Sequence, residues 1–442
     1  MSTLSEQQLA ALSALWDTLP GATREKLWLA AGETGKLADT FRLLDARAKL
    51  KEPKSASGAS PLFRIFADVT GGDDRPPSHA RFSQSQLKRI HELAGLEKIE
   101  LPSEAGEQAR WKACREEAAD AVTRLIERAE ADKAVRTPLV DACGQDFAAL
   151  LEDAACLLRH DQALTDSLRP FDETIPELSP DLVTAARDAY EKICSEAPEA
   201  SLWFLKILTA RLEKTTQIFR VVEKIGRRND DALVSKTDLA DIGDLVLANA
   251  EFHAGRFARM PETLAEADTA GHALADFVRT SVGMTREFGI RKDGRWGKTL
   301  FAIRANASAS LEEFFKHVEK TFSRAVPHPG KGHRGMARPE PLPRADRIER
   351  AEADLRFLAI SGEWASQAAV GGAQKHVADM VRDELDECAR ALLEILRTAE
   401  GDAAELAAEG LELIVRYMRA FKDEENAELI HRRAVAVRAN AA

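Results

Sequence analysis

The sequence predicts an all-α protein, either a multi-helix bundle or an irregular helical array, with at most one short β-hairpin near residues 288–301. Ala and Leu dominate the chain, whereas only 2 Tyr accompany 18 Phe and 6 Trp, and this composition favours helices over strands. Apolar residues also recur every three to four positions. With 45% hydrophobic and 31% charged residues among 442, the chain has enough apolar material for a core, which excludes wholesale disorder.

The first strongly periodic segment is 107–133. Its apolar residues at steps of three and four are Trp111, Cys114, Ala118, Val122, Leu125 and Ala129. Side chains at this spacing share one face of a helix, so an amphipathic helix is predicted here.

Two serine- or threonine-proline pairs predict the starts of further helices. Thr137-Pro138 and Ser179-Pro180 each place a capping side chain before a proline at the first helical position. Residues 200–225 then predict one long apolar helix, whose stripe runs through Phe204, Leu208, Leu212, Phe219 and Val222. A helix that apolar is typical of the centre of a bundle.

A second amphipathic helix is predicted over 376–397. Its buried stripe is Val377, Val381, Leu385, Cys388, Leu392 and Ile395. The opposite face carries charges, including the i,i+4 pair Asp386 and Arg390, which suits a face in water.

Proline and glycine mark the predicted boundaries. Residues 325–344 contain five prolines and several glycines, which favour a linker or a long exposed loop. The domains expected from these breaks are an N-terminal helical region 1–100, a central helical bundle 101–324, the basic Pro/Gly loop 325–344 and a C-terminal helical region 345–442.

The cysteines and the absence of apolar runs bear on the compartment. Five widely spaced cysteines include no C-x-x-C pair, so zinc-ribbon and thioredoxin sites are excluded and a reducing cytoplasm is favoured. The first residues lack the pattern of a secretory signal, and no run approaches the roughly 18 apolar residues of a spanning helix. We therefore expect a cytoplasmic protein without a transmembrane segment.

The segment Gly294-Arg295-Trp296-Gly297-Lys298-Thr299 ends like a phosphate-binding P-loop. A P-loop needs glycine six residues before the lysine, whereas this chain has Lys292 there. The pair Asp293-Gly294 instead favours a type I′ turn. Such a turn would join two short strands, so a hairpin is expected at 288–301.

This turn lies in the most basic part of the chain. Residues 286–350 carry a net charge of +7 within a protein of −11, and such asymmetry is an argument about partners. A basic hairpin with an aromatic tip suits a phosphate backbone or an acidic surface, including this protein's own acidic remainder. The expected partner-binding residues are Arg291, Lys292, Arg295, Trp296, Lys298, Lys331, Arg334 and Arg338.

Two acidic patterns are interpreted as structural. Gly71-Gly72-Asp73-Asp74 reads as a surface turn, although its acids suit a divalent ion. Glu428 and His431 form one E-x-x-H pair, where a di-iron site in a helical bundle needs two such pairs. We expect no catalytic motif, no metal site and no cofactor.

The leading functional hypothesis is a helical scaffold or adaptor that contacts a protein partner, with the basic region as a second contact surface and a homo-oligomer left open. The first alternative is a nucleic-acid-associated regulator that uses residues 286–344. The second is an enzyme of unrecognised type, which would require a deep polar pocket with perturbed titratable groups.

Overall fold

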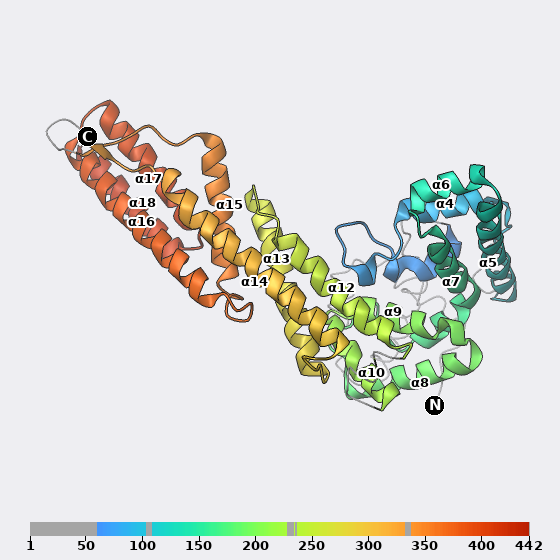
Figure 1. Ribbon diagram of the computed structural model, residues 1–442. Coiled ribbons are helices and arrows are strands. Elements are labelled where there is room, and N and C mark those ends of the chain that lie inside the picture. The colour runs from blue at the N-terminus through green and yellow to red at the C-terminus, as the bar shows by residue number, and fades with distance from the viewer. Residues whose placement is uncertain (1–59, 103–107, 228–233, 235–236, 332–336, 442) are drawn as a thin grey trace, which may run out of the picture. The chain divides into compact units, whose positions relative to one another are not determined.

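The all-α prediction is confirmed by the computed structural model (Figure 1), which describes residues 60–102, 108–227, 234, 237–331 and 337–441. Residues 1–59, which include most of the expected N-terminal region, lie outside these ranges. The chain divides into two compact units: unit 1 is residues 1–70 and 82–161, and unit 2 is residues 71–81 and 162–442.

Unit 1 is built from short 3-10 helices and longer α-helices. Its elements are η1 (Pro61–Val69), α4 (Gln84–Ala94), η3 (Leu96–Lys98), α5 (Gln108–Ala131), α6 (Lys133–Cys143) and the first part of α7 (Phe147–Leu168). The predicted stripe of α5 is buried at Ala118, Val122, Leu125 and Ala129, which confirms the helix predicted over 107–133. Phe66 packs edge-on against Phe63 and Phe82, with ring centroids 5.1 and 5.0 Å apart.

Unit 2 continues α7 and adds the remaining elements. They are η2 (Pro77–His79), α8 (Pro180–Glu196), η4 (Pro198–Ala200), α9 (Ser201–Arg211), η5 (Thr215–Gln217), α10 (Ile218–Gly226), α12 (Ala240–Phe257), α13 (Leu264–Glu287), α14 (Arg295–Thr321), η6 (Phe322–Arg324), β1 (Gly330–Lys331), β2 (Ala337–Arg338), α15 (Ala345–Ser361), α16 (Gly371–Thr398), α17 (Asp402–Ala420) and α18 (Glu424–Ala441).

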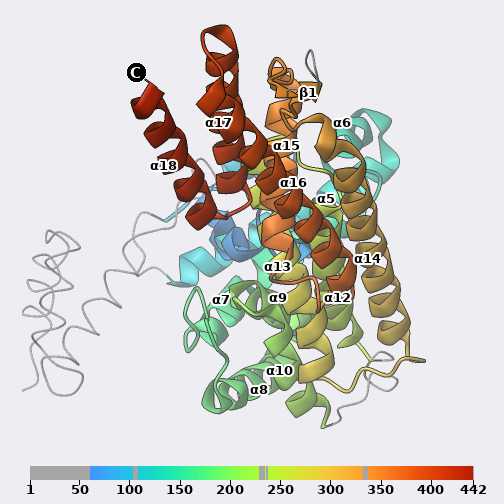
Figure 2. The same cartoon turned by 90° about the vertical axis from the view of Figure 1, so that its left-hand side faces the viewer.

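The long helices of unit 2 pack against helices that are next in the sequence and against helices farther along the chain. Helix α13 lies beside α12 and α15, α14 lies beside α12 and α16, and α16, α17 and α18 each contact the other two (Figures 1 and 2). All six residues of the stripe predicted over 376–397 are buried in α16, so that helix is confirmed. Because α13 has neighbours on several sides, twelve of its residues are buried.

The hairpin expected near 288–301 is not formed. Gly294 is the N-cap of α14 and residues 295–301 are helical, because Trp296 and Leu300, four residues apart, are both buried on the inner face of this helix. The described strands are instead β1 and β2, an antiparallel pair of two residues each with Gly330 opposite Arg338.

The single helix expected over 200–225 is broken into α9 and α10. Leu212 is extended, with φ −78° and ψ 125°, and the segment forms an isolated parallel bridge to Ile175. The Ile175 amide donates to the Arg211 carbonyl at 2.7 Å, and the Glu213 amide donates to the Ile175 carbonyl at 3.0 Å. These long-range bonds replace helical bonds, so α9 ends before Leu212, and Glu213 and Lys214 are exposed between α9 and η5.

The two predicted proline starts have different outcomes. Ser179 caps α8 by accepting from the Leu182 amide at 3.3 Å, and Pro180 is its first residue, as predicted. The start at Thr137-Pro138 is wrong, because Asp132 caps α6 five residues earlier by accepting from the Ala134 amide at 2.8 Å. Pro138 therefore lies inside the helix.

The expected loop 325–344 is attached to the C-terminal helices on its N-terminal side. The Tyr417 hydroxyl donates to the Ala325 carbonyl at 2.9 Å, and the Cys388 thiol donates to the Pro327 carbonyl at 3.3 Å. His328 Nε2 lies 2.9 Å from Glu384 Oε1. Residues 332–336 lie outside the described ranges. The segment 325–328 is thus held by buried side chains of α16 and α17.

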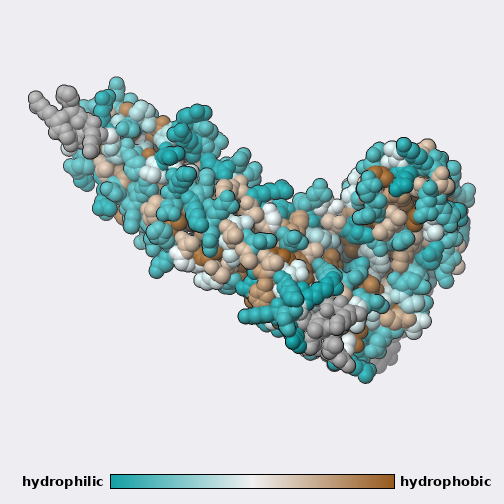
Figure 3. Space-filling view, viewed as in Figure 1, coloured by the Kyte–Doolittle hydropathy of each residue, from teal (hydrophilic) through white to brown (hydrophobic). Residues whose placement is uncertain are grey.

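Among the described residues, no helix combines the length and apolar character that crossing a membrane requires. Over α14, α16 and α18, the face seen in Figure 3 is mainly hydrophilic with small separate apolar patches. A hydrophilic outer face is typical of helices that bury a single apolar stripe.

Candidate functional site

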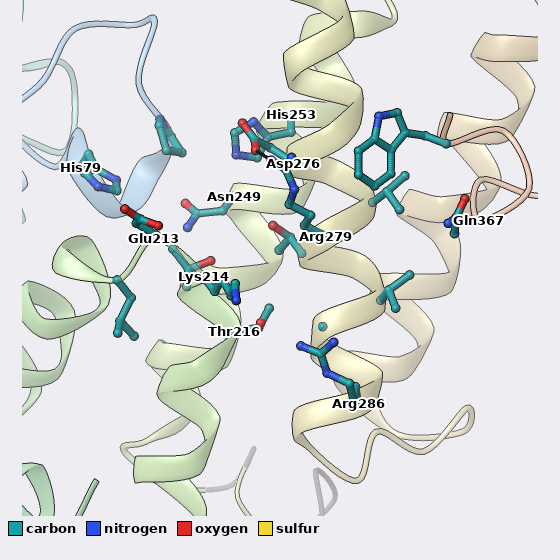
Figure 4. Close-up of a pocket in the computed structure, with 18 residues that line it drawn as sticks. His79, Glu213, Lys214, Thr216, Asn249, His253, Asp276, Arg279, Arg286 and Gln367 are labelled. Atoms are coloured by element: carbon teal, nitrogen blue, oxygen red, sulfur yellow. Dashed lines mark hydrogen bonds and ion pairs between the residues drawn. The ribbon is translucent and has the colours of Figure 1, made fainter. Parts of the chain in front are cut away.

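One cavity of unit 2 lies against α13 and has a volume of about 600 Å³ (Figure 4). Five segments of the chain supply its walls: residues 76–79, residues 212–216, α12, α13 and the turn that contains Trp364 and Gln367. Small-molecule sites in proteins commonly have this size and combine apolar walls with a few convergent polar groups.

One face of α13 provides the long wall of the cavity. Asp276, Arg279, Thr280, Gly283 and Arg286 line it, and pairs three or four residues apart, such as Asp276 with Thr280 and Arg279 with Gly283, lie on the same side of the helix. The helical rise of 1.5 Å per residue separates the Cα atoms of Asp276 and Arg286 by about 15 Å along the axis. The cavity is therefore elongated, with different side chains at its two ends.

At the first end, Asn249 fixes the position of His79. The Asn249 side chain of α12 is buried, accepts from the Ser78 amide at 3.0 Å and donates to Ser78 Oγ at 3.0 Å. Ser78 Oγ in turn lies 2.9 Å from His79 Nδ1. This chain of hydrogen bonds holds η2 on α12 and points the His79 imidazole at the cavity (Figure 4).

His253 lies at the same end, beside Asp276 (Figure 4). Burial lowers the pKa of His253 below 6.5, while Asp276 opposes the shift and Arg256 and His79 add to it. The imidazole is therefore neutral at pH 7 and presents one acceptor and one donor nitrogen. Asp276 also accepts from Arg279 at 2.9 Å, an exposed pair that fixes geometry more than it stabilises the fold.

At the second end, Arg286 is tied to Glu287. Two of its guanidinium nitrogens donate to Glu287 Oε1 at 3.1 and 2.9 Å, and Arg220 donates to the same carboxylate at 2.7 and 3.3 Å. The hydrogen bond from Arg220 holds the pKa of Glu287 below its ordinary value; burial opposes this, and Arg286 adds to it. Two cations thus share one carboxylate next to the cavity.

Gly283 allows the 212–216 segment to approach α13. A Cβ atom at Gly283 would lie 2.5 Å from Thr216 Oγ1 and 3.1 Å from Thr216 Cβ. Thr216 is itself buried, so its side chain has little room to move away. The glycine therefore sets the distance between these two walls.

Apolar side chains also line the cavity. Val278 and Val282 of α13 and the ring of Trp364 line it, and the Arg279 guanidinium lies 5.3 Å from the Trp364 ring centroid. A ligand with an apolar middle section would contact these side chains without loss of hydrogen bonds.

Trp296 is placed differently from the aromatic tip expected from the sequence. Its ring is fully buried, contacts Phe219 and Phe288 with centroids 5.9 Å away in each case, and donates from Nε1 to Asp244 at 2.9 Å. The ring also fills the space where a side chain at Gly243 would stand. Trp296 is thus a core residue and is not available to stack on a partner.

The other predicted residues of the turn have internal partners or lie on the surface. Arg291 donates to Asp293 at 3.2 and 3.1 Å, and Arg295 pairs with Asp244. Lys292 lies 5.7 Å from the Phe301 ring centroid, and Lys298 is exposed. Part of the basic region therefore binds the acidic remainder of the same chain, one of the outcomes that the sequence suggested.

The P-loop-like segment has a packing explanation. A Cβ atom at Gly297 would collide with the Arg291 carbonyl, so the close contact between the 291–294 turn and the first turn of α14 requires glycine. Of the remaining predicted residues, Lys331 is in β1, Arg338 is exposed in β2, and Arg334 lies outside the described residues. Arg338 does not line the cavity.

The cavity residues were not identified from the sequence. Glu213 and Lys214 fall inside the segment predicted as helix, and Asn249 and His253 carry no motif. The one available signal was the polar pair Glu213-Lys214 inside an apolar stripe. No group of three or more His, Cys, Asp or Glu able to hold a metal ion occurs among the described residues.

Comparison of the chain with protein-family models, curated proteins and solved structures finds no match.

Proposed function

We propose that unit 2 binds a small organic molecule in the cavity along α13. One observation carries the proposal: a space of about 600 Å³ is lined by charged and polar side chains together with the apolar Leu212, Val278 and Val282. A volume of this size suits a small organic molecule. The enzyme alternative requires such a cavity too, and capture of a small molecule is its first step.

The polar groups are positioned in advance of binding. Asn249 holds the His79 segment, Asp276 pairs with Arg279, and Glu287 holds Arg286. A site whose side chains are already fixed loses less conformational entropy when a ligand enters. This supports a binding role over a space left by imperfect packing.

The test is to block the cavity. Val282 lines the cavity and is 36% exposed, so Val282→Trp would fill the space without adding bulk to the core. The matched control is Val435→Trp, at a 53% exposed position of α18. Binding of hexanoate, hexylamine, indole and p-cresol is measured by calorimetry and by thermal shift.

We expect at least one of these four probes to bind the wild type and Val435→Trp, and to lose at least tenfold in affinity with Val282→Trp. Equal affinity of a probe for all three proteins, or no binding by any of the four, would reject the proposal.

A second proposal retains the contact with a protein partner that the sequence suggested. Lys298, Lys316 and Lys320 are exposed on α14, and none has an ion-pair partner among the described residues. The 18 residues from Lys298 to Lys316 make five helical turns, so these side chains share one face. Glu312 and Glu313 are also exposed beside Lys316, so attraction to an acidic protein surface would come from these three unpaired ammonium groups.

The triple variant Lys298→Glu, Lys316→Glu and Lys320→Glu tests this second proposal. It should lower retention on a polyglutamate resin at low salt, whereas the same reversals at Lys112, Lys206 and Lys422 should not. Equal retention of the two triple variants would contradict it. A mobility shift of duplex DNA that weakens steeply with salt would favour the nucleic-acid alternative instead.

A further inference from the structure

We infer that the cavity along α13 accepts a molecule that carries an acidic group at one end and an amino group at the other. The inference rests on the proposed binding function and adds the chemical class of the ligand and its orientation. The acidic group would lie by Lys214 and Arg286, and the amino group by Glu213 and Asp276.

The end near Arg286 favours an anion. Arg286 and Arg220 share the Glu287 carboxylate, and Glu177 also faces Arg220. Lys214 adds an exposed ammonium group that has no ion-pair partner among the described residues. A carboxylate of the ligand would receive charge-assisted hydrogen bonds from this end.

The opposite end favours a hydrogen-bond donor with positive charge. In Figure 4, Glu213, His79, Asn249, His253 and Asp276 gather there, away from Arg286. Glu213 and Asp276 contribute two carboxylates, and Arg279 compensates one of them. The neutral His253 ring adds an acceptor nitrogen. An ammonium group donates three hydrogen bonds and matches this set.

The separation of the ends sets the length of the ligand. The Cα atoms of Asp276 and Arg286 are about 15 Å apart along α13, and their side chains shorten that span by reaching inward. Val278, Val282 and Trp364 give the cavity an apolar part. An extended chain of roughly eight carbons fits between the two polar ends, so 8-aminooctanoate is a suitable probe.

The experiment measures the affinities of 8-aminooctanoate, octanoate and octylamine for the full chain by calorimetry. We expect 8-aminooctanoate to bind at least tenfold more tightly than either single-charge probe. Arg286→Gln should weaken 8-aminooctanoate and octanoate about fivefold and leave octylamine unchanged. Asp276→Asn should weaken 8-aminooctanoate and octylamine and leave octanoate unchanged. The control Arg397→Gln removes a pair with Glu394 on α16, outside the cavity, and should change none of the three.

The outcomes separate this inference from the proposed function. If 8-aminooctanoate binds no more tightly than octanoate and octylamine, or if both cavity variants affect all probes equally, the inference is wrong. In that case, Val282→Trp still decides the binding function with its own four probes. Loss of those probes in Val282→Trp would uphold binding with a different ligand class, whereas unchanged affinities would reject both.

Discussion

The basic turn at 291–298 and the cavity along α13 both combine cations with an aromatic ring, yet they use them differently. In the turn, Trp296 is buried and Arg295 pairs with Asp244, so both side chains hold α14 against α12. In the cavity, Trp364 and Arg286 border open space. The turn is contiguous in the sequence, whereas the cavity collects side chains from five segments.

The glycines show the same contrast. Gly243 and Gly297 are positions where a side chain would collide with Trp296 or with the Arg291 backbone, so the space they leave is fully occupied. Gly283 brings Thr216 close to α13 at the edge of a space that stays open. A cluster of charge and aromatic residues in a sequence therefore indicates a binding site only when the fold leaves room beside it.

The largest expected effect comes from Trp296→Ala. Removal of a fully buried ring and of its hydrogen bond to Asp244 should lower the free energy of unfolding by about 3–5 kcal/mol. The matched variant Trp364→Ala removes a partly exposed ring and should cost about 1 kcal/mol. Urea unfolding measures both. Equal losses of unfolding free energy in the two variants would contradict the view that Trp296 is a core residue and Trp364 a cavity residue.

Glu287→Gln tests the ion cluster between the two regions. The pKa of Glu287 is lowered in the folded protein, so its stabilisation is present at neutral pH and is lost as pH falls through its folded pKa. We expect a loss of about 2 kcal/mol at pH 7. The difference between wild type and variant should shrink as the pH falls below about 4. A difference that does not change with pH would show that the carboxylate charge is irrelevant.

In contrast to Glu287→Gln, the variant Asp354→Asn should raise the free energy of unfolding at alkaline pH. The Asp354 carboxyl is buried on α15, 3.6 Å from Arg350 Nε and from His317 Nε2, and its Oδ1 has no hydrogen-bond partner. Burial raises the pKa of Asp354 to about 7, and Arg350 opposes the shift. Because the folded pKa exceeds the unfolded value, wild-type stability falls as pH rises from about 4 to 7.

The variant should therefore be more stable than the wild type by about 1–2 kcal/mol at pH 8, and the gain should vanish near pH 4. Thermal unfolding at both pH values checks this. A destabilised variant at pH 8 would mean that attraction to Arg350 and His317 outweighs the cost of burying the charge.

The smallest effect is expected from Lys292→Glu. Lys292 is exposed and its main contact is with the Phe301 ring, so its reversal should change the free energy of unfolding by less than about 0.5 kcal/mol. The same assay measures it. A loss above 1 kcal/mol would show that the turn depends on this charge.

Local patterns in the sequence predicted much of the fold and little of the candidate site. The stripes of α5 and α16 and the cap at Ser179 follow from residues within a few positions of one another. The break at Leu212 does not, because its cause is the hydrogen bonding of Ile175 to Arg211 and Glu213. The wall 212–216 was therefore hidden inside an apparently continuous apolar stripe.

The sequence by itself determined that this chain forms amphipathic helices, because the spacing of apolar side chains decides which face each helix buries. Only the tertiary structure decided where open space remains. The cavity depends on Gly283 meeting Thr216 and on Asn249 holding the His79 segment. Those contacts join positions far apart in the chain, and no local pattern specifies them.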